Sequence, residues 1–574
     1  MHGFFIKYGV KADWQLSSFG CQMLRRDFSH DSFTLEQVTL PKFVADKVWY
    51  SDGEVLIAVE GVLFNLSELK QEYNEDSAGK LLKLMYRQQG VKMVNRLRGT
   101  FAVVIYDIKK EQCYVLNDQT GSHLLFVCEH SGGVLVASDL LKMQCVIRHP
   151  LSRSFAATML TYGYSPICET PVEGVRRIGA GEMLRIDADG AHVEHYHTFT
   201  NNSVPSKSLS HYIDDFELLF QRAVCRILQK NKEYGLMNFM PLSAGLDSRM
   251  TVIVAHELRL GDIHNFTYSQ SDFYDQQIPQ EIASFLGNEW LFRPLDGGDY
   301  LANVDGVIGR TEGLIQFSGA AQTECILPML PTEKIGVIAT GMLGDIIANS
   351  YTKHAESVHY IAEGAESKQI LHLLPDNIYT ELEHYRSREL YYLYVRGFYC
   401  ANLGSPIVFQ HFTESVSPFC DVDVLQYCLN IPSELRWNNR FYDAWILRYH
   451  PEAARWKHNG VAQIGNRERM VQIGGRKMLL AQVPKRIVMK LLKELHIANL
   501  YKETVGHSMN PEDSWITQNE SLKHAFDTYF DNNISRLSAW SDIDEAARRL
   551  YHEGTAMERM QVLTLLAALK RYEV

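Results

Sequence analysis

The sequence contains no C-x-x-C pair, although ten cysteines are spread along its 574 residues. That scatter argues against a disulfide framework or a zinc site and favours a protein kept reduced in the cytoplasm. The chain also lacks a dense run of lysine and arginine, and its formal net charge is −11. We therefore expect neither a nucleic acid nor an anionic membrane as its partner.

Long apolar runs and a leader segment are missing as well. The start, MHGFFIKYG, has no basic segment before a long apolar one, so we expect no secretory signal. A long uncharged stretch, Gly397–Thr413, is interrupted by Asn402, Pro406 and His411, and we expect it to be buried in a soluble protein. With 46% hydrophobic and 22% charged residues, the composition is globular and excludes disordered classes.

Two patterns divide the chain near residue 200. Residues 1–198 read as short strands with turn signals, for example Gly53–Asn65 and Gly99–Asp118. Residues 199–210 are polar and unpatterned, which predicts a linker. Residues 211–470 alternate strands with helices, which indicates a parallel sheet covered by helices. We expect a helical extension over residues 471–574, including a basic amphipathic helix over Arg476–His496.

The strongest local signal is the nonapeptide PLSAGLDSR, residues 241–249, between an apolar strand and a helix. Small residues there let backbone N–H groups and the helix dipole face an anion, which is how many proteins hold phosphate. The hydroxyls of Ser243 and Ser248 add donors, and Asp247 suits a magnesium ion held against phosphate oxygens. No Gly-Lys-Ser/Thr follows, so this is not a Walker A loop. A plain turn with a helix cap is the alternative.

Three further elements follow in order. Thr340–Asp345 (TGMLGD) comes after an apolar strand, Glu414–Asp421 (ESVSPFCD) precedes a helix, and Lys457–Val461 (KHNGV) comes last. Together with the nonapeptide, these elements resemble the ATP-pyrophosphatase synthetase domain of the asparagine synthetase family, over about residues 211–465. The resemblance implies a parallel-sheet domain that binds ATP and makes adenylated intermediates.

The first domain carries a second resemblance. Glu60–Asn65, Gly99–Ala102, Asp118–Gly121 and Ala137–Asp139 follow the order of landmarks in class II glutamine amidotransferase domains. That resemblance implies an α/β/β/α sandwich of the N-terminal-nucleophile type. The fold class expected for the whole chain is therefore α/β, with this sandwich first, the ATP-pyrophosphatase domain second and a helical C-terminal region.

Several positions depart from the family pattern. The amidotransferase nucleophile is a cysteine at position 2, whereas this chain has His2, and the Asn-Gly-Glu of the glutamine pocket is replaced by residues that begin with Glu60. We expect the first domain to be an inactive scaffold. In the second domain, Met342 stands where asparagine synthetases have a glutamate, and Val416 replaces an arginine. Ala244 replaces a glycine and fits only where φ is negative.

By resemblance, the ATP and pyrophosphate site would use two loops and two strand ends, with a magnesium ion on the carboxylates of Asp247 and Asp345. Lys457 would add positive charge, and Glu414 would orient or deprotonate an amine, although a buried salt bridge is an equal alternative. The expected ATP and pyrophosphate residues are Leu242, Ser243, Ala244, Gly245, Asp247, Ser248, Thr267, Tyr268, Gly341 and Asp345.

The resemblance implies an ATP-dependent ligase that activates a carboxylate as an acyl-adenylate and transfers it to an amine or ammonia. Its cofactors would be ATP and Mg²⁺, and its partners small-molecule or peptide carboxylates and amines. A homodimer remains open. The alternatives are asparagine synthesis from free ammonia, closure of a lactam ring within one substrate, and an ATP-binding scaffold without activity. Retention of Asp247, Asp345 and Lys457 favours an enzyme over a scaffold.

Overall fold

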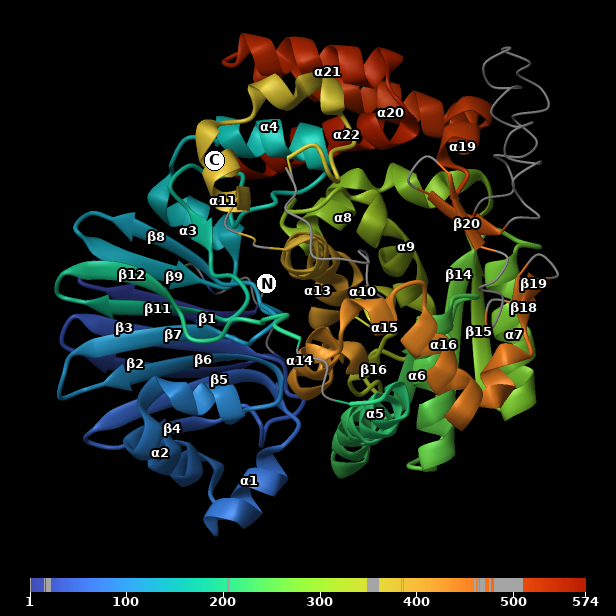
Figure 1. The fold of residues 1–574 in the computed structure, drawn as a ribbon. Helices are drawn as coiled ribbons and strands as arrows, with labels where there is room; N and C mark the ends of the chain where they lie inside the picture. Colours follow the sequence, from blue (N-terminus) through green and yellow to red (C-terminus); the bar gives the residue numbers. More distant parts are fainter. Residues whose placement is uncertain are drawn as a thin grey trace.

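The computed structural model describes residues 2–14, 16, 22–203, 207–347, 361–383, 385, 387–458, 461–462, 464, 470–473, 476–479 and 509–573. In these ranges the chain forms an N-terminal sandwich of two sheets, a smaller parallel sheet covered by helices, and a group of C-terminal helices (Figure 1). None of the described helices is both long and apolar enough to span a membrane.

Two antiparallel six-stranded sheets pack face to face in the N-terminal part. Their strand orders are β10-β8-β9-β1-β3-β2 and β12-β11-β7-β6-β5-β4. Alternate residues of each strand point to opposite faces, so Phe4 and Ile6 join the core between the sheets while Phe5 faces outward. The strands are β1 Gly3–Tyr8, β2 Leu24–His30, β3 Phe33–Thr39, β4 Trp49–Ser51, β5 Val55–Leu63, β6 Gly99–Asp107, β7 Gln112–Asn117, β8 Phe126–His130, β9 Gly133–Ala137, β10 Arg176–Arg177, β11 Glu182–Asp187 and β12 Gly190–His195.

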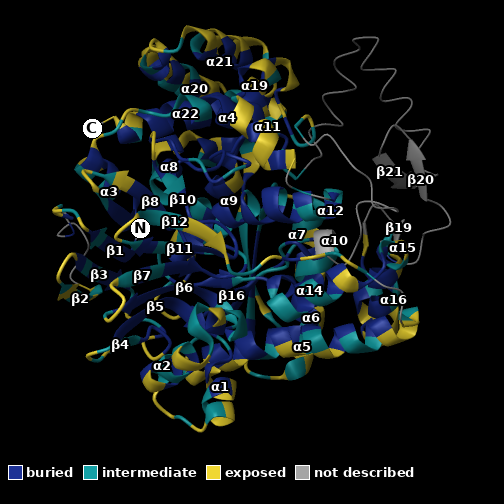
Figure 2. Cartoon of the chain, turned by 60° about the vertical axis from the view of Figure 1, so that its left-hand side comes forward, coloured by how far each residue is buried: buried dark blue, intermediate teal, exposed yellow. Residues whose placement is uncertain are grey.

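Helices cover the outer face of each sheet and complete four layers. Leu81 and Met85 of α2 pack on Ile57 of the second sheet, and Phe155 of α4 packs with Phe5 of the first. Figure 2 shows the strands as mostly buried. The predicted α/β/β/α sandwich is therefore confirmed. The helices are α1 Leu66–Tyr73, α2 Ala78–Gln89, η2 Gly90–Arg96, α3 Leu140–Ile147 and α4 Arg153–Tyr162.

The second region is built on parallel strands. β13, β14 and β15 form one sheet, β16 and β17 pair in parallel, and a parallel bridge between Met237 and Ile335 brings β16 beside β13. Leucine, valine and aromatic side chains of α5, α6 and α16 cover one face, and Phe409 and Ile326 cover the other. The strands are β13 Asn238–Pro241, β14 Ile263–Ser269, β15 Glu289–Pro294, β16 Ile338–Ala339 and β17 Ser415–Val416.

The helices of this region begin at α5, which Ser208 caps through the N–H of His211. The predicted alternation of strands and helices is confirmed up to β16, after which the described chain is mostly helical. The helical elements are α5 Leu209–Glu233, α6 Leu246–Leu258, α7 Tyr274–Leu286, η3 Asp296–Ala302, α8 Val304–Thr311, α9 Ser318–Ile326, η4 Leu327–Met329, α10 Gly344–Ile347, η5 Lys368–Leu373, α11 Asp376–Glu383, α12 Arg388–Tyr391, η6 Tyr392–Phe398, η7 Ala401–Leu403, α13 Ser405–Gln410, η8 Pro418–Cys420, α14 Val422–Asn430, α15 Ser433–Arg436, α16 Arg440–Tyr449 and η9 Pro451–Ala454.

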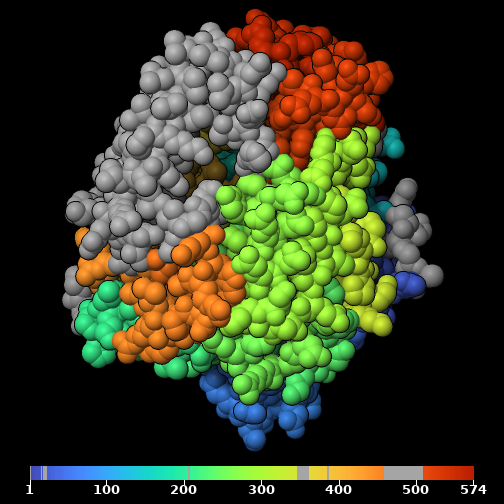
Figure 3. All heavy atoms as spheres, turned by 90° about the vertical axis from the view of Figure 1, so that its right-hand side faces the viewer, coloured from blue at the N-terminus to red at the C-terminus, as the bar shows by residue number. Residues whose placement is uncertain are grey.

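The C-terminal helices pack on both preceding regions. Leu563 and Leu566 of α22 share one core with Phe155 of the sandwich and Val307 of α8. Figure 3 shows these helices, in red, lying directly against the green part of the parallel-sheet region. A capping box between Thr555 and Glu558 starts α22. The helices are α19 Glu512–Gln518, α20 Glu520–Asn533, η12 Ile534–Leu537, α21 Ser541–Glu553 and α22 Ala556–Tyr572.

One predicted helix differs in the structure. The segment expected to be helical from Arg476 begins as strand β21 (Arg476–Leu479), which pairs with β20 (Met470–Ile473). A short apolar run such as Met478–Leu479 fits a strand as well as a helix, and a partner strand decides between them. The remainder, residues 480–496, lies outside the described residues. A second hairpin pairs β18 (Lys457–His458) with β19 (Val461–Ala462).

Candidate functional site

The loop between β13 and α6 is held in place by its own side chains. The hydroxyl of Ser248 accepts a hydrogen bond from the backbone N–H of Ser243 at 3.0 Å and lies 2.9 Å from the Ser243 hydroxyl. Buried Arg249 donates to the carbonyl of Ala244 at 2.9 Å, and Asp275 of α7 accepts from the Ala244 N–H at 2.8 Å. Ala244 is not among the described residues with positive φ, so alanine fits there as expected.

The loop after β16 meets the first loop at very short range. The backbone N–H of Asp345 donates to the carboxylate of Asp247 at 2.9 Å. A Cβ on Gly341 would lie 2.2 Å from the backbone nitrogen of Ser248, and one on Gly344 would lie 2.5 Å from Cγ of Asp247. Only glycine leaves room for this contact, which brings both predicted carboxylates to one edge of the parallel sheet.

The carboxylate of Asp247 has unusual surroundings at this edge of the sheet. Its other oxygen accepts from the buried Tyr442 hydroxyl at 2.9 Å. Burial, together with the nearby charge of Asp345, raises the pKa of Asp247 to about 7. Two negative side chains that interact in this way suit a divalent cation bound together with an anionic ligand, because Mg²⁺ prefers oxygen ligands.

A cavity of about 300 Å³ opens at this edge of the sheet. The side-chain hydroxyl of Thr267 donates to the carbonyl of Leu242 at 2.6 Å and accepts from the Trp290 ring N–H at 2.9 Å, which holds the two strand ends together. Eight predicted residues line this cavity: Leu242, Ser243, Gly245, Asp247, Ser248, Thr267, Tyr268 and Gly341.

Four predicted residues do not line the cavity. Ala244 is buried behind the loop, and Asp345 is exposed beside it. Lys457 is exposed on β18. Glu414 is buried elsewhere, at the contact between the two domains. Four lining residues were missed by sequence reasoning. Pro241 and Phe266 adjoin predicted strand-end residues, and Met342 was noted only as a departure, but Met509 comes from the C-terminal region and has no signal in the sequence.

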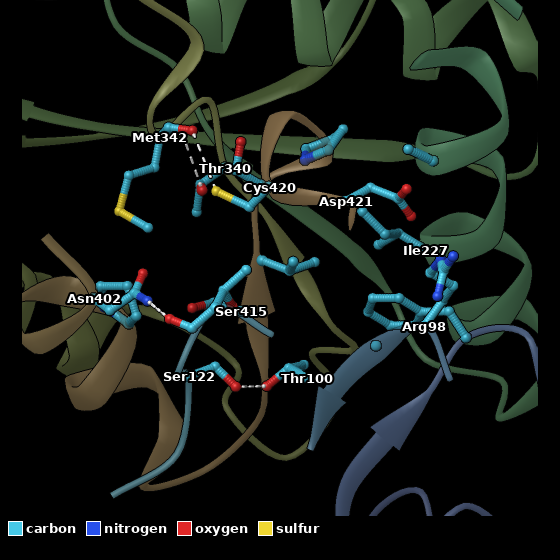
Figure 4. Close-up of a pocket in the computed structure, with 18 of the residues that line it drawn as sticks. Arg98, Thr100, Ser122, Ile227, Thr340, Met342, Asn402, Ser415, Cys420 and Asp421 are labelled. Atoms are coloured by element: carbon cyan, nitrogen blue, oxygen red, sulfur yellow. Dashed lines mark hydrogen bonds between the residues drawn. The ribbon is translucent and has the colours of Figure 1, made fainter. Parts of the chain in front are cut away.

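A second, narrower cavity lies between the domains (Figure 4). Its volume is about 30 Å³, enough for one or two water-sized molecules. Thr100 and Ser122 of the N-terminal domain face Ser415 and Met342 of the second domain across it. Met342 lines this cavity as well as the larger one, so this residue borders both.

Comparison with known proteins agrees with this architecture. A model of the glutamine amidotransferase domain matches residues 44–197, and a model of asparagine synthase matches residues 215–400. The chain belongs to the asparagine synthetase family. The second match contains both loops that meet at Asp247.

The relatives within the asparagine synthetase family are distant. "Asparagine synthetase [glutamine-hydrolyzing] 2" of Bacillus subtilis is 24% identical over 284 residues, covering 42% of this chain and 36% of its own length. "Asparagine synthetase B [glutamine-hydrolyzing]" of Escherichia coli is 23% identical over 279 residues, covering 43% of this chain and 44% of its own length. The match thus spans less than half of these relatives. A solved structure of glutamine phosphoribosylpyrophosphate amidotransferase from B. subtilis aligns with 46% of this chain and 76% of its own length. The two are 14% identical, and the TM-score is 0.23.

The amidotransferase domain of this family member has an ion-paired cluster where the resemblance places a glutamine pocket. Glu60 is buried and accepts hydrogen bonds from Gln37 at 2.7 Å and Thr39 at 2.6 Å. The Lys47 ammonium lies 3.2 Å from the same carboxylate, and His2 lies 3.6 Å from it. Burial alone would raise the pKa of Glu60, but the charge of Lys47, the contact with His2 and the hydrogen bond from Thr39 together outweigh burial and hold that pKa well below its usual range.

Proposed function

We propose that this protein is an ATP-dependent ligase that activates a carboxylate as an acyl-adenylate and then transfers the acyl group to an amine or ammonia. The observation that carries the proposal is the contact between the Asp345 loop and the carboxylate of Asp247 at the mouth of the larger cavity. Membership of the asparagine synthetase family supports it, because the family's synthetase domain supplies both loops.

The first step joins the acid to ATP. A carboxylate oxygen attacks the α-phosphorus, the bond from that phosphorus to the bridging oxygen of the β-phosphate breaks, and pyrophosphate leaves. The loop of Ser243, Gly245 and Ser248, with the N-terminus of α6, would bind the departing pyrophosphate. Thr267 and Tyr268 line the part of the cavity formed by the end of β14, which we assign to the nucleoside.

Asp247 and Asp345 would hold Mg²⁺, whose charge offsets the negative charge that builds up on pyrophosphate. The donor set fits this ion. The Asp345 backbone N–H bonds the Asp247 carboxylate, and the charge of Asp345 is close enough to raise the pKa of Asp247, so the two residues offer two oxygen ligands at one place. Mg²⁺ usually takes one or two carboxylates and completes its ligands with phosphate oxygens and water. Lys457, exposed on the β18–β19 hairpin, would add further positive charge by analogy with the family.

In the second step the amine nitrogen attacks the carbonyl carbon, the bond to the AMP oxygen breaks, and the nitrogen loses a proton. Met342 can neither accept that proton nor pair with an ammonium, so this chain differs here from the family members that carry a glutamate.

The deciding experiment is ATP–pyrophosphate exchange with purified protein, Mg²⁺ and a panel of carboxylic acids. We expect exchange that depends on one class of acid. If none of the acids in the panel supports exchange although the protein binds ATP measurably, a nucleotide-binding scaffold would be favoured instead.

A further inference from the structure

Glu414 lies in the second domain but has its side-chain partners in the first. Its carboxylate accepts a hydrogen bond from the hydroxyl of Thr100 at 3.1 Å, and the Nε2 atom of His123 lies 3.5 Å from the same oxygen. The Thr100 hydroxyl is also 3.2 Å from that nitrogen. All three side chains are buried. A proton on Nε2 of His123 gives a directed chain, in which His123 donates to Thr100 and Thr100 donates to Glu414.

The N-terminal domain holds these two partners rigidly. Thr100 is in β6, within the second sheet of the sandwich. The backbone of His123 is fixed from both sides by Asn117, which accepts from its N–H at 3.2 Å and donates to its carbonyl at 2.7 Å. Gly61 on the adjacent strand makes space, because a Cβ there would lie 2.8 Å from Nε2 of His123.

On the other side, Glu414 is linked by backbone hydrogen bonds to the nucleotide site. Its carbonyl accepts from the N–H of Ile338 in β16 at 2.9 Å, and Val416 accepts from the N–H of Thr340 at 2.9 Å. Strands β17 and β16 therefore pair directly after Glu414. The chain then passes from Thr340 into Gly341, where a Cβ would lie 2.2 Å from the backbone nitrogen of Ser248.

We propose that Glu414 is a positioning residue, and that the N-terminal domain uses Thr100 and His123 to hold the Gly341–Asp345 loop in register with the Asp247 loop. This inference rests on the proposed function for its kinetic consequences. It gives a domain without a thiol at position 2 a continuing role in the synthetase reaction. Glu414 does not act on a substrate in this scheme, because it does not line the larger cavity.

The test compares three single variants. Thr100→Val keeps the shape of the side chain but removes the donor to Glu414, whereas Thr100→Ser keeps the hydroxyl. The matched control is Gln144→Met, which removes buried hydrogen bonds from α3 to His149 and to the carbonyl of Tyr572, away from β16. Each is measured by thermal unfolding and by kcat and KM for ATP in ATP–pyrophosphate exchange.

We expect Thr100→Val to lower kcat at least tenfold with KM for ATP changed less than threefold, because a displaced loop weakens stabilisation of the transition state. Thr100→Ser should stay within threefold of the wild type, and Gln144→Met within twofold at a similar loss of thermal stability. Equal kcat values for Thr100→Val and Gln144→Met, or failure of serine to restore kcat, would refute the positioning role.

A second readout does not depend on activity. In the full-length protein without ligand, amide hydrogen exchange of residues 337–345 should rise at least tenfold in Thr100→Val and stay unchanged in Gln144→Met. If the wild type catalyses no exchange of pyrophosphate, the proposed function fails, and this measurement alone decides the inference. Equal hydrogen exchange of that segment in the two variants would overturn it.

Discussion

The carboxylate of Asp247 accepts a hydrogen bond of 2.9 Å from the backbone N–H of Asp345, although 98 positions separate the two residues in the chain. This bond joins two loops that each follow a buried parallel strand. Since the carboxyl ends of parallel strands meet at one edge of the sheet, residues far apart in sequence form one site. The predictions about the reaction begin from this contact.

Asp247→Asn and Asp345→Asn should each lower acid-dependent ATP–pyrophosphate exchange at least 100-fold, because each removes a negative charge offered to Mg²⁺. Exchange is measured at ordinary magnesium concentrations, after circular dichroism has verified the fold. Asp262→Asn serves as the control, since Asp262 is exposed at the opposite end of β14 and should keep wild-type exchange. A variant at 247 or 345 with wild-type exchange would remove that residue from the metal site.

Gly344→Ala should weaken binding of Mg²⁺–ATP at least tenfold, measured by titration calorimetry. The new methyl group would lie 2.5 Å from Cγ of Asp247 and must displace that carboxylate. Gly53→Ala is the matched control, because nothing lies within 4 Å of a Cβ there and the glycine has an ordinary φ. Unchanged affinity in Gly344→Ala would mean that the two loops do not act together on the nucleotide.

Much of this site could be predicted from the sequence. Leu242 and Thr267 stand at the ends of apolar strands, and a strand end followed by small and acidic residues marks the ligand edge of a parallel sheet. The partners of Glu414 could not be predicted, because Thr100 and His123 belong to another domain and only the docking of the two domains brings them together.

The C-terminal part was harder to predict for a physical reason. Met509 lines the larger cavity, but its neighbours in the sequence form no loop or strand motif that would mark it. The strand at Arg476–Leu479 was expected to be helical, because its short apolar run is compatible with both structures until a pairing partner is known.

The amidotransferase domain should not hydrolyse glutamine. His2 supplies no thiolate, and its Nε2 atom lies 2.8 Å from the carbonyl of Gln410 in the second domain. The variant His2→Cys should also be inactive, because Glu60 stands where the family's Asn-Gly-Glu begins and its carboxylate is paired with the buried ammonium of Lys47. Release of glutamate by both proteins should equal the buffer background. Release above background from the wild type would contradict this prediction.

The stability of the protein should fall as the pH rises from 6.5 to 9. Burial alone would lower the pKa of His450, but ion pairs with Glu217 and Glu257, at 3.0 Å each, raise it from 6.5 to about 9. A pKa raised by folding stabilises the native state fully below the unfolded value of 6.5, and this contribution is lost as the pH rises through 9.

Chemical denaturation at a series of pH values measures this effect. We expect the wild type to lose on the order of 2 kcal/mol more than Glu217→Gln across the window. Arg448→Gln is the control, because it breaks a half-exposed ion pair with Asp214 and should leave the pH dependence unchanged. Parallel curves for the wild type and Glu217→Gln would show that His450 is not the group responsible.

The acyl acceptor should not be simply ammonia acting on aspartate. Family members that make asparagine supply ammonia from a working glutaminase through a tunnel, and this chain lacks the thiol at position 2. Met342, which lines the larger cavity, has a thioether where the resemblance places the glutamate of asparagine synthetases, and a thioether cannot take a proton from the incoming nitrogen. A bulkier amine needs neither feature if it binds to the synthetase domain itself. The larger cavity, of about 300 Å³, has more room for such an amine than the interdomain cavity, of about 30 Å³.

With ATP, Mg²⁺, aspartate and ammonium, the purified protein should therefore form asparagine far below ~1 s⁻¹, the low end for ordinary enzymes. Asparagine is measured by amino-acid analysis. If it forms near that rate, ammonia-dependent asparagine synthesis would be restored as the reaction.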